Sequence, residues 1–423
     1  MKIQSITPRM ILDSRGYPTV EVDLVIEGGF LGRASVPSGA STGSHEALEL
    51  RDGDSHFAGK GVQKAISIIR TAISQKLVLS DISSQKELDQ ILCSLDGTPN
   101  KSNLGANTTL AVSLAYAKAV ALASKKHLFQ YLRDEYTWTK PMSLPVPLVN
   151  VLNGGKHSAA STDIQEWMIV PVGATSFSEA IETCATIFYT LRNILAERGE
   201  SGVGDEGGFP LHNVKSNKDA LTLLSRAVEI AGYELGVDVA FAIDVASSEF
   251  YNDRHYELNC DKKILSSNEM IEYLHSLALE FPIVSIEDGL AEDDWVSWKT
   301  LTKQLGDTIQ LVGDDLFVTN THYIRKGIEE HVANAVLIKP NQIGTISETV
   351  EAILLAHAYG YSTIISHRSG ETEDVSIAHL AVASGSGQIK IGSFSRTERL
   401  AKYNELIRIG EEDMLFYNPY KKE

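Results

Sequence analysis

The chain has 423 residues, of which 43% are hydrophobic, and its 38 Lys and Arg against 55 Asp and Glu give a formal net charge of -17. A chain of this length buries a large core and has room for more than one compact unit. The acidic balance argues against a sequence-independent grip on nucleic acid, which needs a clustered basic face, so no nucleic-acid partner is predicted.

The cysteines and the first residues of the chain indicate in which cellular compartment the protein is expected. Cys93, Cys184 and Cys260 lie far apart and form no CxxC pair, so neither a disulfide framework nor a structural zinc site is predicted. The first ten residues contain no apolar signal core, and the most apolar helical stretch is short and carries Lys118. We therefore expect a cytoplasmic protein without a membrane span. A surface or secreted pool that uses no signal would leave no trace in the sequence.

The first part of the chain predicts a small antiparallel sheet followed by helices. Residues 18–29 alternate apolar and polar side chains before a Gly-Gly turn, and residues 30–36 resume the strand pattern. Apolar residues then recur at intervals of three and four, the spacing of a helix, in residues 62–77, 83–97 and 106–126. Residues 1–135 are predicted to form an α+β domain. The proline-containing stretch 133–147 is the predicted junction to a second domain at 143–423.

Beyond this junction, short apolar runs typical of buried strands alternate with helical patterns. The eight predicted strands are residues 146–153, 166–172, 239–244, 283–288, 309–314, 333–339, 362–366 and 387–392. Two helices, at 176–198 and 217–234, separate the second strand from the third. Eight strands with interleaved helices predict an α/β fold with a closed barrel, and a doubly wound open sheet is the structural alternative.

Ionisable side chains lie at or just past the carboxyl ends of the last six predicted strands. They are Asp244, Glu287, Asp314, Lys339, His367 and Lys390. One such residue would most simply be a solvated strand end, but six in succession predict a shared mouth, because barrel chemistry sits at the carboxyl ends of the strands. Three carboxylates from adjacent strands are hard oxygen ligands, which favour magnesium, manganese or calcium, and magnesium is the default inside a cell. Asp315, beside Asp314, is either a supporting group or a plain surface acid.

The direction of the chain places further groups at this mouth. If the first barrel strand rises to the mouth and the second descends as its antiparallel neighbour, the connection at residues 154–166 lies there. It carries His157, Gln165 and Glu166. The glycine-rich segment after the first barrel helix would then also reach the mouth with Glu206, although an ordinary helix-ending loop fits this segment equally well.

Two literal motif matches are rejected on their context. Residues 202–207 spell GxGxxG but follow a helix rather than a strand, which argues against a dinucleotide site. Residues 39–43 spell GxSxG, yet they lie in a loop beside an antiparallel meander instead of crowning a parallel sheet, which argues against a serine hydrolase. The loop at 37–44 is better interpreted as mobile from its composition, with a plain surface linker as the alternative.

Several stretches, in order along the whole chain, resemble the enolases of glycolysis. The most specific is SHRSGETED, and the others include VPSGASTG, VLNGGKH, VGDEGGF, SIEDGL, LVGDDLFVTN, LIKPNQIGT and GQIKIGSFSRTERLAKYNELIRIGEE. The resemblance implies an N-terminal α+β domain followed by an eight-stranded β/α barrel whose second strand is antiparallel. It also implies the reversible dehydration of 2-phosphoglycerate to phosphoenolpyruvate.

The resemblance further implies roles for individual residues. Asp244, Glu287 and Asp314 would hold one magnesium ion, and Ser41 would bind a second that arrives with substrate. Lys339 would take the C2 proton, with its pKa lowered by metal and by Lys390. Glu206 would assist departure of the 3-hydroxyl beside Glu166. Substrate anions would meet His157, Gln165, Arg368, Ser369 and Lys390, with His367 in the same pocket.

The sequence departs from the family pattern at Ile391 and in residues 156–161, which bears on loop closure and substrate affinity and touches no predicted catalytic position. Related enzymes of the wider superfamily act on non-phosphorylated carboxylates. A second hypothesis is an enolase-fold binding module on a cell surface or in an RNA assembly, with or without activity. Enolases form homodimers or octamers, and the sequence does not choose between the two.

Overall fold

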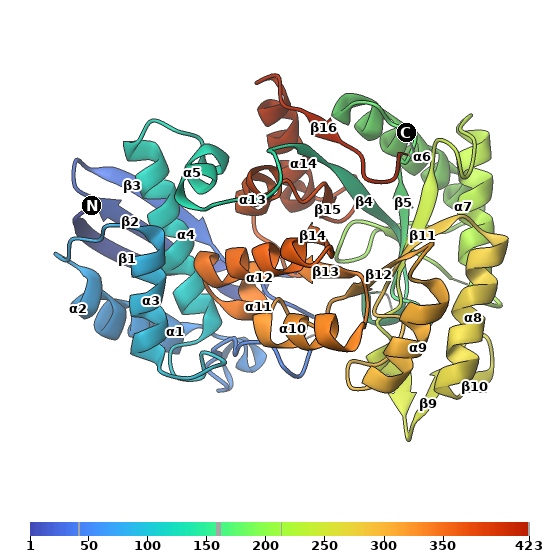
Figure 1. The fold of residues 1–423 in the computed structure, drawn as a ribbon, viewed down its shortest axis with the longest axis horizontal. Coiled ribbons are helices and arrows are strands. Elements are labelled where there is room, and N and C mark those ends of the chain that lie inside the picture. The colour runs from blue at the N-terminus through green and yellow to red at the C-terminus, as the bar shows by residue number, and fades with distance from the viewer. Residues whose placement is uncertain (41–42, 158–161, 213, 422–423) are drawn as a thin grey trace.

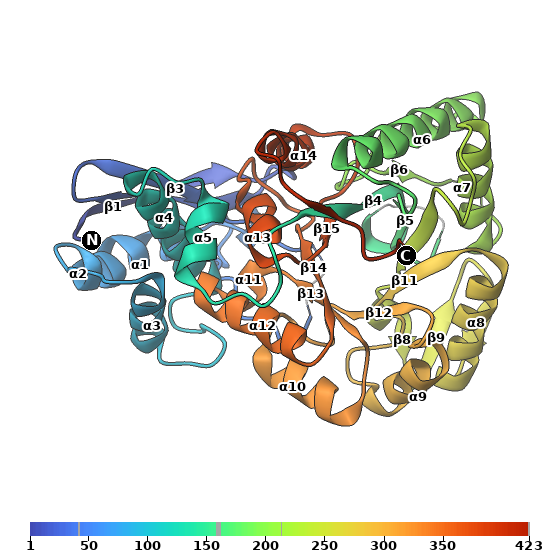
Figure 2. The ribbon, with the colours of Figure 1, turned by 45° about the horizontal axis from the view of Figure 1, so that its top comes forward.

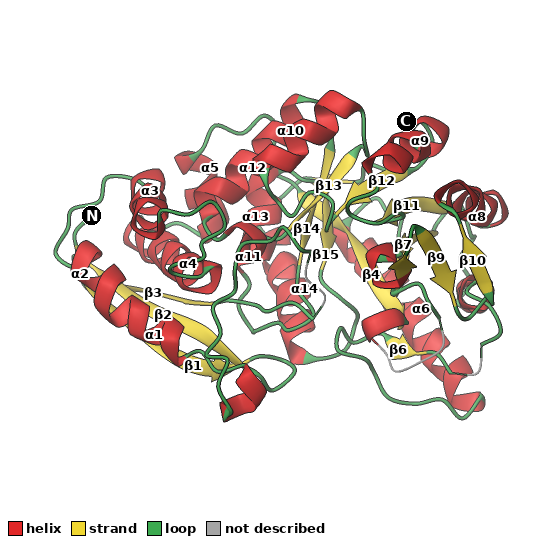
Figure 3. Cartoon of the chain, turned by 90° about the horizontal axis from the view of Figure 1, so that it is seen from below, coloured by secondary structure: helices red, strands yellow, loops and turns green. Residues whose placement is uncertain are grey.

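The computed structural model describes residues 1–40, 43–157, 162–212 and 214–421. An antiparallel sheet opens the chain, formed by β1 (Ile3–Leu12), β2 (Pro18–Ile26) and β3 (Phe30–Ser35) in sequence order. Five helices follow it, namely α1 (Gln63–Ile68), α2 (Ser74–Leu77), α3 (Gln85–Asp96), α4 (Ala106–Ala123) and α5 (Leu128–Glu135). Figure 3 shows this sheet and its helices beside the barrel. The predicted helix at 62–77 forms, with a π-helical turn at Ile69–Ile73 joining α1 to α2.

Helix α4 packs on the N-terminal sheet. It is apolar on nearly all sides and buries 14 of its 18 residues, which is typical of a helix enclosed between two layers. Its backbone meets β3 at Gly32, where a Cβ atom would lie 1.9 Å from the carbonyl oxygen of Ala115 and 2.5 Å from the amide nitrogen of Ala119. The absence of a side chain at Gly32 therefore sets the distance between helix and sheet.

Eight strands close into a barrel in the second part of the chain (Figure 1). They are β4 (Leu144–Asn153), β5 (Glu166–Val170), β7 (Ala240–Asp244), β11 (Ile283–Glu287), β12 (Gln310–Gly313), β13 (Ala335–Ile338), β14 (Ser362–Ser366) and β15 (Gln388–Lys390). Pairing of β15 with β4 closes the circle. Only β5 among them runs antiparallel to its neighbours, β4 on one side and β7 on the other. The predicted barrel with an antiparallel second strand is confirmed, and the open-sheet alternative is wrong.

Helices surround the barrel strands on the outside (Figure 2). They are α6 (Phe177–Glu197), α7 (Lys218–Ile230), α8 (Ser267–Glu280), α9 (Trp295–Leu305), α10 (Thr321–Glu330), α11 (Pro340–Ile343), α12 (Ile346–Ala358), α13 (Ser376–Ser384) and α14 (Thr397–Gly410). Side-chain caps begin several of them. Ser266, for example, accepts from the backbone of Glu269, whose carboxylate accepts in return from the backbone of Ser266, forming a capping box.

Short elements complete the chain. They are β6 (Phe209–Pro210), β8 (Tyr251–Asn252), β9 (His255–Leu258), β10 (Lys263–Leu265), β16 (Phe416–Tyr417) and the 3-10 turns His56–Gly59, Gly155–His157 and Ser247–Phe250. The tail after β16 passes beneath the barrel, where the Tyr420 hydroxyl donates to Gln388 Oε1 at 2.5 Å and accepts from Gln310 Nε2 at 3.1 Å. Because Gln388 and Gln310 begin their strands, Tyr420 covers the end of the barrel opposite the strand carboxyl ends.

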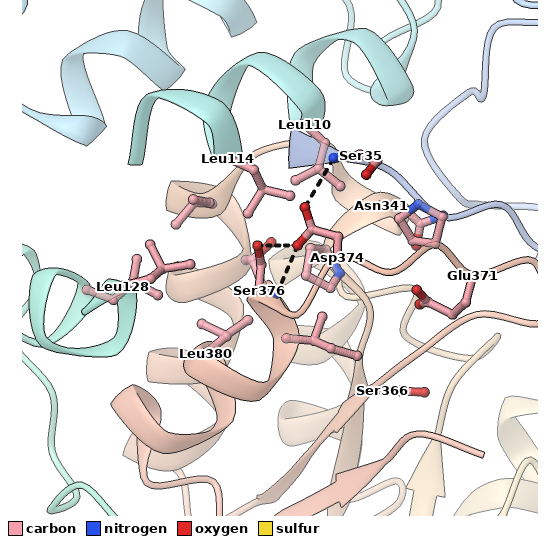
Figure 4. A pocket seen from close by; sticks show the side chains of 16 residues that line it. Ser35, Leu110, Leu114, Leu128, Asn341, Ser366, Glu371, Asp374, Ser376 and Leu380 are labelled. Atoms are coloured by element: carbon pink, nitrogen blue, oxygen red, sulfur yellow. Dashed lines mark hydrogen bonds between the residues drawn. The ribbon is translucent and has the colours of Figure 1, made fainter. Parts of the chain in front are cut away.

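An apolar cavity of about 40 Å³ lies where α4 and α5 face α13 (Figure 4). Leu110, Leu114, Leu128 and Leu380 contribute to its wall, and Asp374 lies at its polar edge.

None of the helices in the described ranges combines the length and the apolar character that a membrane crossing requires.

Candidate active site at the barrel mouth

Neighbouring strands bring three acidic residues side by side at the mouth. Asp244 ends β7 and Glu287 ends β11, and the two are directly paired across the strands. Glu166 begins the antiparallel β5 and is paired with Asp244 on its other side. All three are at least 96% buried. Burial, and next the charge of Asp244, raises the pKa of Glu287 well above its usual range, and burial and Glu206 do the same for the pKa of Glu166.

The ammonium group of Lys390 lies among these carboxylates. Its Nζ is 3.0 Å from Asp244 Oδ2, 2.9 Å from Glu287 Oε1 and 3.2 Å from Glu166 Oε2. Burial by itself would lower the pKa of Lys390, but the three carboxylates outweigh burial and raise it well above its usual value. Lys390 is therefore held as a cation in this arrangement.

Lys339 follows β13 and forms an ion pair with Asp314, which follows β12. Gln342 holds the other oxygen of Asp314, donating from Nε2 to Oδ1 at 2.9 Å. Burial lowers the pKa of Lys339, but Asp314 outweighs burial, and the net effect is a raised pKa. The lowered pKa of Lys339 expected from the sequence depends on bound metal ions as well as on Lys390, so it stays a prediction.

Glu206 reaches the mouth from the glycine-rich segment after α6, as the chain direction predicted. Its Oε2 accepts from Asn150 Nδ2 at 3.1 Å and lies 3.3 Å from His367 Nε2. The backbone of Ser393, just beyond β15, donates to the Glu206 carbonyl at 2.9 Å. The ordinary-loop alternative is therefore disfavoured, since side chains from two barrel strands fix the carboxyl group.

Arg368 and Ser369, which follow β14, meet the N-terminal part of the chain. The Arg368 guanidinium spans both oxygens of Glu46, with Nη1 2.8 Å from Oε2 and Nη2 3.1 Å from Oε1. Ser369 Oγ accepts from the backbone amide of Ala40 at 2.7 Å. Ala40, within the predicted mobile loop 37–44, and Glu46, just after it, thus contact residues of the mouth.

One pocket gathers most of the predicted site residues. Its lining includes Gln165, Glu166, Glu206, Asp244, Asp314, Lys339, His367, Arg368, Ser369 and Lys390. Glu287 joins them through its contact with Lys390. Ser41 lies outside the described residues, and of His157 only the backbone, in the turn Gly155–His157, is described.

The donor set fits divalent cations that prefer oxygen. Carboxylates outnumber cations in the described part of the mouth. Burial, followed by the charge of Asp244, raises the pKa of Glu287, and a divalent cation would offset this negative charge. A second acidic group adjoins it, since Asp288, Asp314 and Asp315 offer oxygens within 4.8 Å of one another. Asp288 also accepts from the backbone amides of Asp314 and Asp315 at 3.0 and 2.9 Å, so it shapes the turn that presents Asp314. Asp315 is half-buried beside the buried Asp288 and Asp314, which favours the supporting role over a surface acid.

Sequence reasoning missed several side chains that hold the site together. They are Glu46, Asn150, Asp288, Gln342 and Arg399. Each acts on a residue far away in the chain, so no spacing rule could have assigned its partner. Only Asp288 carried a local signal, as a second acid beside Glu287 at the end of a predicted strand.

Comparison with known proteins gives two family matches. The description "Enolase, N-terminal domain" matches residues 3–132, and "Enolase, C-terminal TIM barrel domain" matches residues 141–420. A protein named "Enolase" from Legionella pneumophila (strain Lens) is 53% identical over 419 residues, which cover 99% of this chain and 98% of that protein. The "Enolase" of Legionella pneumophila (strain Corby) is 54% identical over the same shares of both chains.

Proposed function

Because the chain belongs to the enolase family, we propose that it catalyses the reversible, magnesium-dependent dehydration of 2-phospho-D-glycerate to phosphoenolpyruvate. It is a lyase of the phosphopyruvate hydratase type. The observation that carries the proposal is the convergence of Lys339 and Glu206 with Asp244 and Asp314 on one pocket. A basic group, an acidic group and oxygen ligands for metal are the set that removal of a proton and a hydroxyl from adjacent carbons requires.

Asp244, Glu287 and Asp314 are the residues that would hold the first magnesium ion, and Ser41 is the predicted ligand of the second. Bound magnesium would supply positive charge that offsets the negative charge developing on the substrate carboxylate when the C2 proton leaves. The enolase superfamily is a standard example of this pairing of a Lys or His base with magnesium. The acidic excess at the mouth supports the assignment.

Lys339 is the proposed base for the C2 proton. Its Nζ must be a free amine to accept that proton, whereas its pairing with Asp314 favours the ammonium form. Any cation that shares the charge of Asp314 would weaken this pairing and lower the pKa of Lys339. The proposal therefore assigns Asp314 two roles, as metal ligand and as the group whose neutralisation frees the base.

Glu206 is the proposed acid that assists departure of the 3-hydroxyl, with Glu166 beside it. Burial and the charge of Glu206 raise the pKa of Glu166, which favours a proton shared by the two carboxyl groups at this edge of the pocket. Arg368, Ser369 and Lys390, with His157 and Gln165, are the proposed substrate-binding groups. The fork of Arg368, which already spans two carboxylate oxygens of Glu46, suits bidentate contact with a phosphate.

The test is the absorbance of phosphoenolpyruvate formed from 2-phosphoglycerate, with magnesium and with magnesium removed by a chelator. We expect Lys339→Ala to slow the reaction by about 100- to 10,000-fold, the range that a general base contributes. Lys299→Ala, at an exposed position on α9, is the matched control and should keep full activity. Absence of product from the folded native protein with excess metal and substrate would contradict the proposal and favour the binding-module hypothesis.

Other expectations stay predictions. They are the cytoplasmic location, the homodimeric or octameric assembly, and the domain limits 1–135 and 143–423. The contacts of Glu46 and Ala40 with the barrel support the expectation that the N-terminal domain contributes to the site.

A further inference from the structure

Arg399, on the last helix α14, is fully buried beside the mouth and has no role in the function proposed above. Its Nη1 lies 2.5 Å from His367 Nδ1 and donates to the Arg368 carbonyl at 2.6 Å. Its Nη2 donates to the carbonyls of Ser369 at 2.5 Å and Asp205 at 3.1 Å. One guanidinium thus joins the segment after β14 to the residue that precedes Glu206.

The contact with His367 determines where the imidazole carries its proton. A guanidinium has only donors and stays protonated in proteins, so His367 Nδ1 must be the acceptor of this hydrogen bond. His367 is then the neutral tautomer with its proton on Nε2. Nε2 of His367 lies 3.3 Å from Glu206 Oε2 and donates its hydrogen to that oxygen.

This tautomer has a consequence for Glu206. Its Oε2 accepts from His367 Nε2 and also from Asn150 Nδ2 at 3.1 Å. Two donors aimed at one oxygen leave the acid proton of Glu206 to Oε1. In the opposite tautomer, Nε2 of His367 would be an acceptor, and the Glu206 proton would be held on Oε2 in a hydrogen bond to the imidazole.

We propose that Arg399 is a positioning residue, which acts through His367 to keep the acid proton of Glu206 on Oε1. The inference rests on the proposed role of Glu206 as the acid that assists loss of the hydroxyl group. Arg399 touches no reacting atom in this scheme. It selects, by one hydrogen bond, which oxygen of the carboxyl group delivers the proton.

The charged groups that face His367 agree with the neutral form. Burial, opposed by Glu206 and supported by Arg399 and Lys390, lowers the pKa of His367 to about 4. The frame around the ring is also tight, since a Cβ atom at Gly392 would lie 2.6 Å from the Glu206 carbonyl, 2.9 Å from Arg399 Cδ and 3.2 Å from His367 Cε1. The ring therefore has little freedom to turn away from Arg399.

The direct test is nitrogen NMR of protein labelled with ¹⁵N-histidine, in which the two ring nitrogens report the tautomer. His367→Asn identifies the signals of His367 among those of the 12 histidines. At neutral pH we expect the native protein to show a protonated Nε2 and a bare Nδ1. A protonated Nδ1 in the native protein would overturn the proposal, whether or not the protein shows any activity.

Arg399→Met removes the donor, and we expect Nδ1 of His367 to gain a proton in this variant. Arg396→Met is the matched control on the same segment, because Arg396 donates from Nε to the Gly204 carbonyl at 2.8 Å. This control should leave the His367 signals unchanged. If Arg399→Met folds and keeps a bare Nδ1, the proposal is wrong. If it does not fold, Arg399→Lys, which keeps a donor and the charge, should retain the bare Nδ1, and a protonated Nδ1 there counts against the proposal.

Kinetics separate this inference from the proposed function. With active native protein, Arg399→Met should lower kcat by about 10- to 100-fold, part of what general acid catalysis contributes, with a smaller change in KM. Arg399→Lys should restore part of kcat. Native protein that shows the expected tautomer but forms no product would refute the proposed function alone, whereas active protein whose kcat is insensitive to Arg399→Met would refute the inference alone.

Discussion

Arg368 binds Glu46 through two separate nitrogens of its guanidinium group. Both Nη atoms contact Glu46, and Nη1 also lies 3.2 Å from Asn341 Oδ1. Burial lowers the pKa of Arg368, but Glu46 outweighs burial, so the guanidinium is a permanent cation next to the proposed phosphate site. A planar fork with two directed donors is what distinguishes Arg from Lys at such a position.

Arg368→Lys tests whether the fork or only the charge matters. Lysine keeps the positive charge but presents one compact ammonium group, so it cannot hold Glu46 and a phosphate with two parallel bonds. We expect kcat/KM for 2-phosphoglycerate to fall by about 10- to 100-fold, which corresponds to about 1.4 to 2.7 kcal/mol of lost stabilisation. Steady-state kinetics measure this loss. An unchanged kcat/KM in the folded variant would mean that charge alone suffices.

At the residue scale, the sequence could place the chemistry but not its supports. Asp244, Asp314 and Lys339 end predicted strands, Glu287 is the last but one residue of its strand, and His367 directly follows one, because strand ends can be located from apolar runs. The partners of these groups could not be located in this way. Arg399, for instance, lies in an amphipathic helix where an arginine normally faces solvent, and only the packing of α14 against the segment after β14 shows that it is buried.

At the scale of elements, β3 and α4 meet backbone to backbone at Gly32. Gly32 is buried, while its neighbour Leu31 points to the other face and is 43% exposed, as strand alternation requires. The atoms nearest to a Cβ at Gly32 belong to the backbone of α4 and cannot rotate away.

Gly32→Ala should therefore force the helix off the sheet. We expect the free energy of unfolding to fall by about 1 to 3 kcal/mol, the usual cost of overpacking, in urea titrations followed by circular dichroism. Leu31→Ala on the exposed face of the same strand is the control and should cost less. Equal stability of Gly32→Ala and the native chain would show that α4 can shift without penalty.

Long, regular elements were predictable and short ones were not. Strands β2 and β3 and most long helices carry clear periods of two or 3.6 residues, and the barrel strands stand out as short apolar runs. Strand β1, whose buried residues do not alternate regularly, was not predicted. The small sheet β8–β10 has strands of two to four residues, two of them largely exposed, so it offers too little hydrophobic pattern to detect. The π-helical turn at Ile69–Ile73 was not predicted either, because one widened turn leaves the apolar spacing nearly unchanged.

At the scale of the whole molecule, a buried carboxylate joins the two parts of the chain. Asp374 Oδ2 pairs with Lys118 Nζ of α4 at 2.6 Å and accepts from the backbone amide of Ser35 at 3.1 Å (Figure 4 shows the Ser35 contact). Oδ1 accepts from Ser376. Burial alone would raise the pKa of Asp374, but Lys118 and Ser376 outweigh burial and lower it to about 2.

This shift predicts a pH-dependent contribution to stability. A carboxyl group with a folded pKa of about 2 and an unfolded pKa of about 3.9 stabilises the fold above pH 4, and the stabilisation is lost as the pH falls towards 2. We expect Asp374→Asn to lower the free energy of unfolding by about 2 kcal/mol at neutral pH. Urea titrations at several pH values should show the gap between native and variant narrowing below pH 4.

The control for this prediction is Asp413→Asn, at an exposed position after α14, which should leave the unfolding free energy nearly constant at each pH. A gap for Asp374→Asn that stays the same from pH 7 to pH 3 would show that hydrogen-bond geometry, rather than ionisation of Asp374, stabilises the joint between α4 and the barrel.

The position of Tyr420 beneath the barrel bears on how the protein can be attached to a support. The Tyr420 hydroxyl is hydrogen-bonded to Gln388 of β15 and Gln310 of β12. Both glutamines lie at the ends of their strands opposite the mouth. A linker attached after Lys421 would leave the protein at the end of the barrel opposite the mouth. Immobilised protein would then expose the mouth to the surrounding solution. A linker short enough to pull Tyr420 away from Gln388 and Gln310 would instead expose this end of the barrel to water.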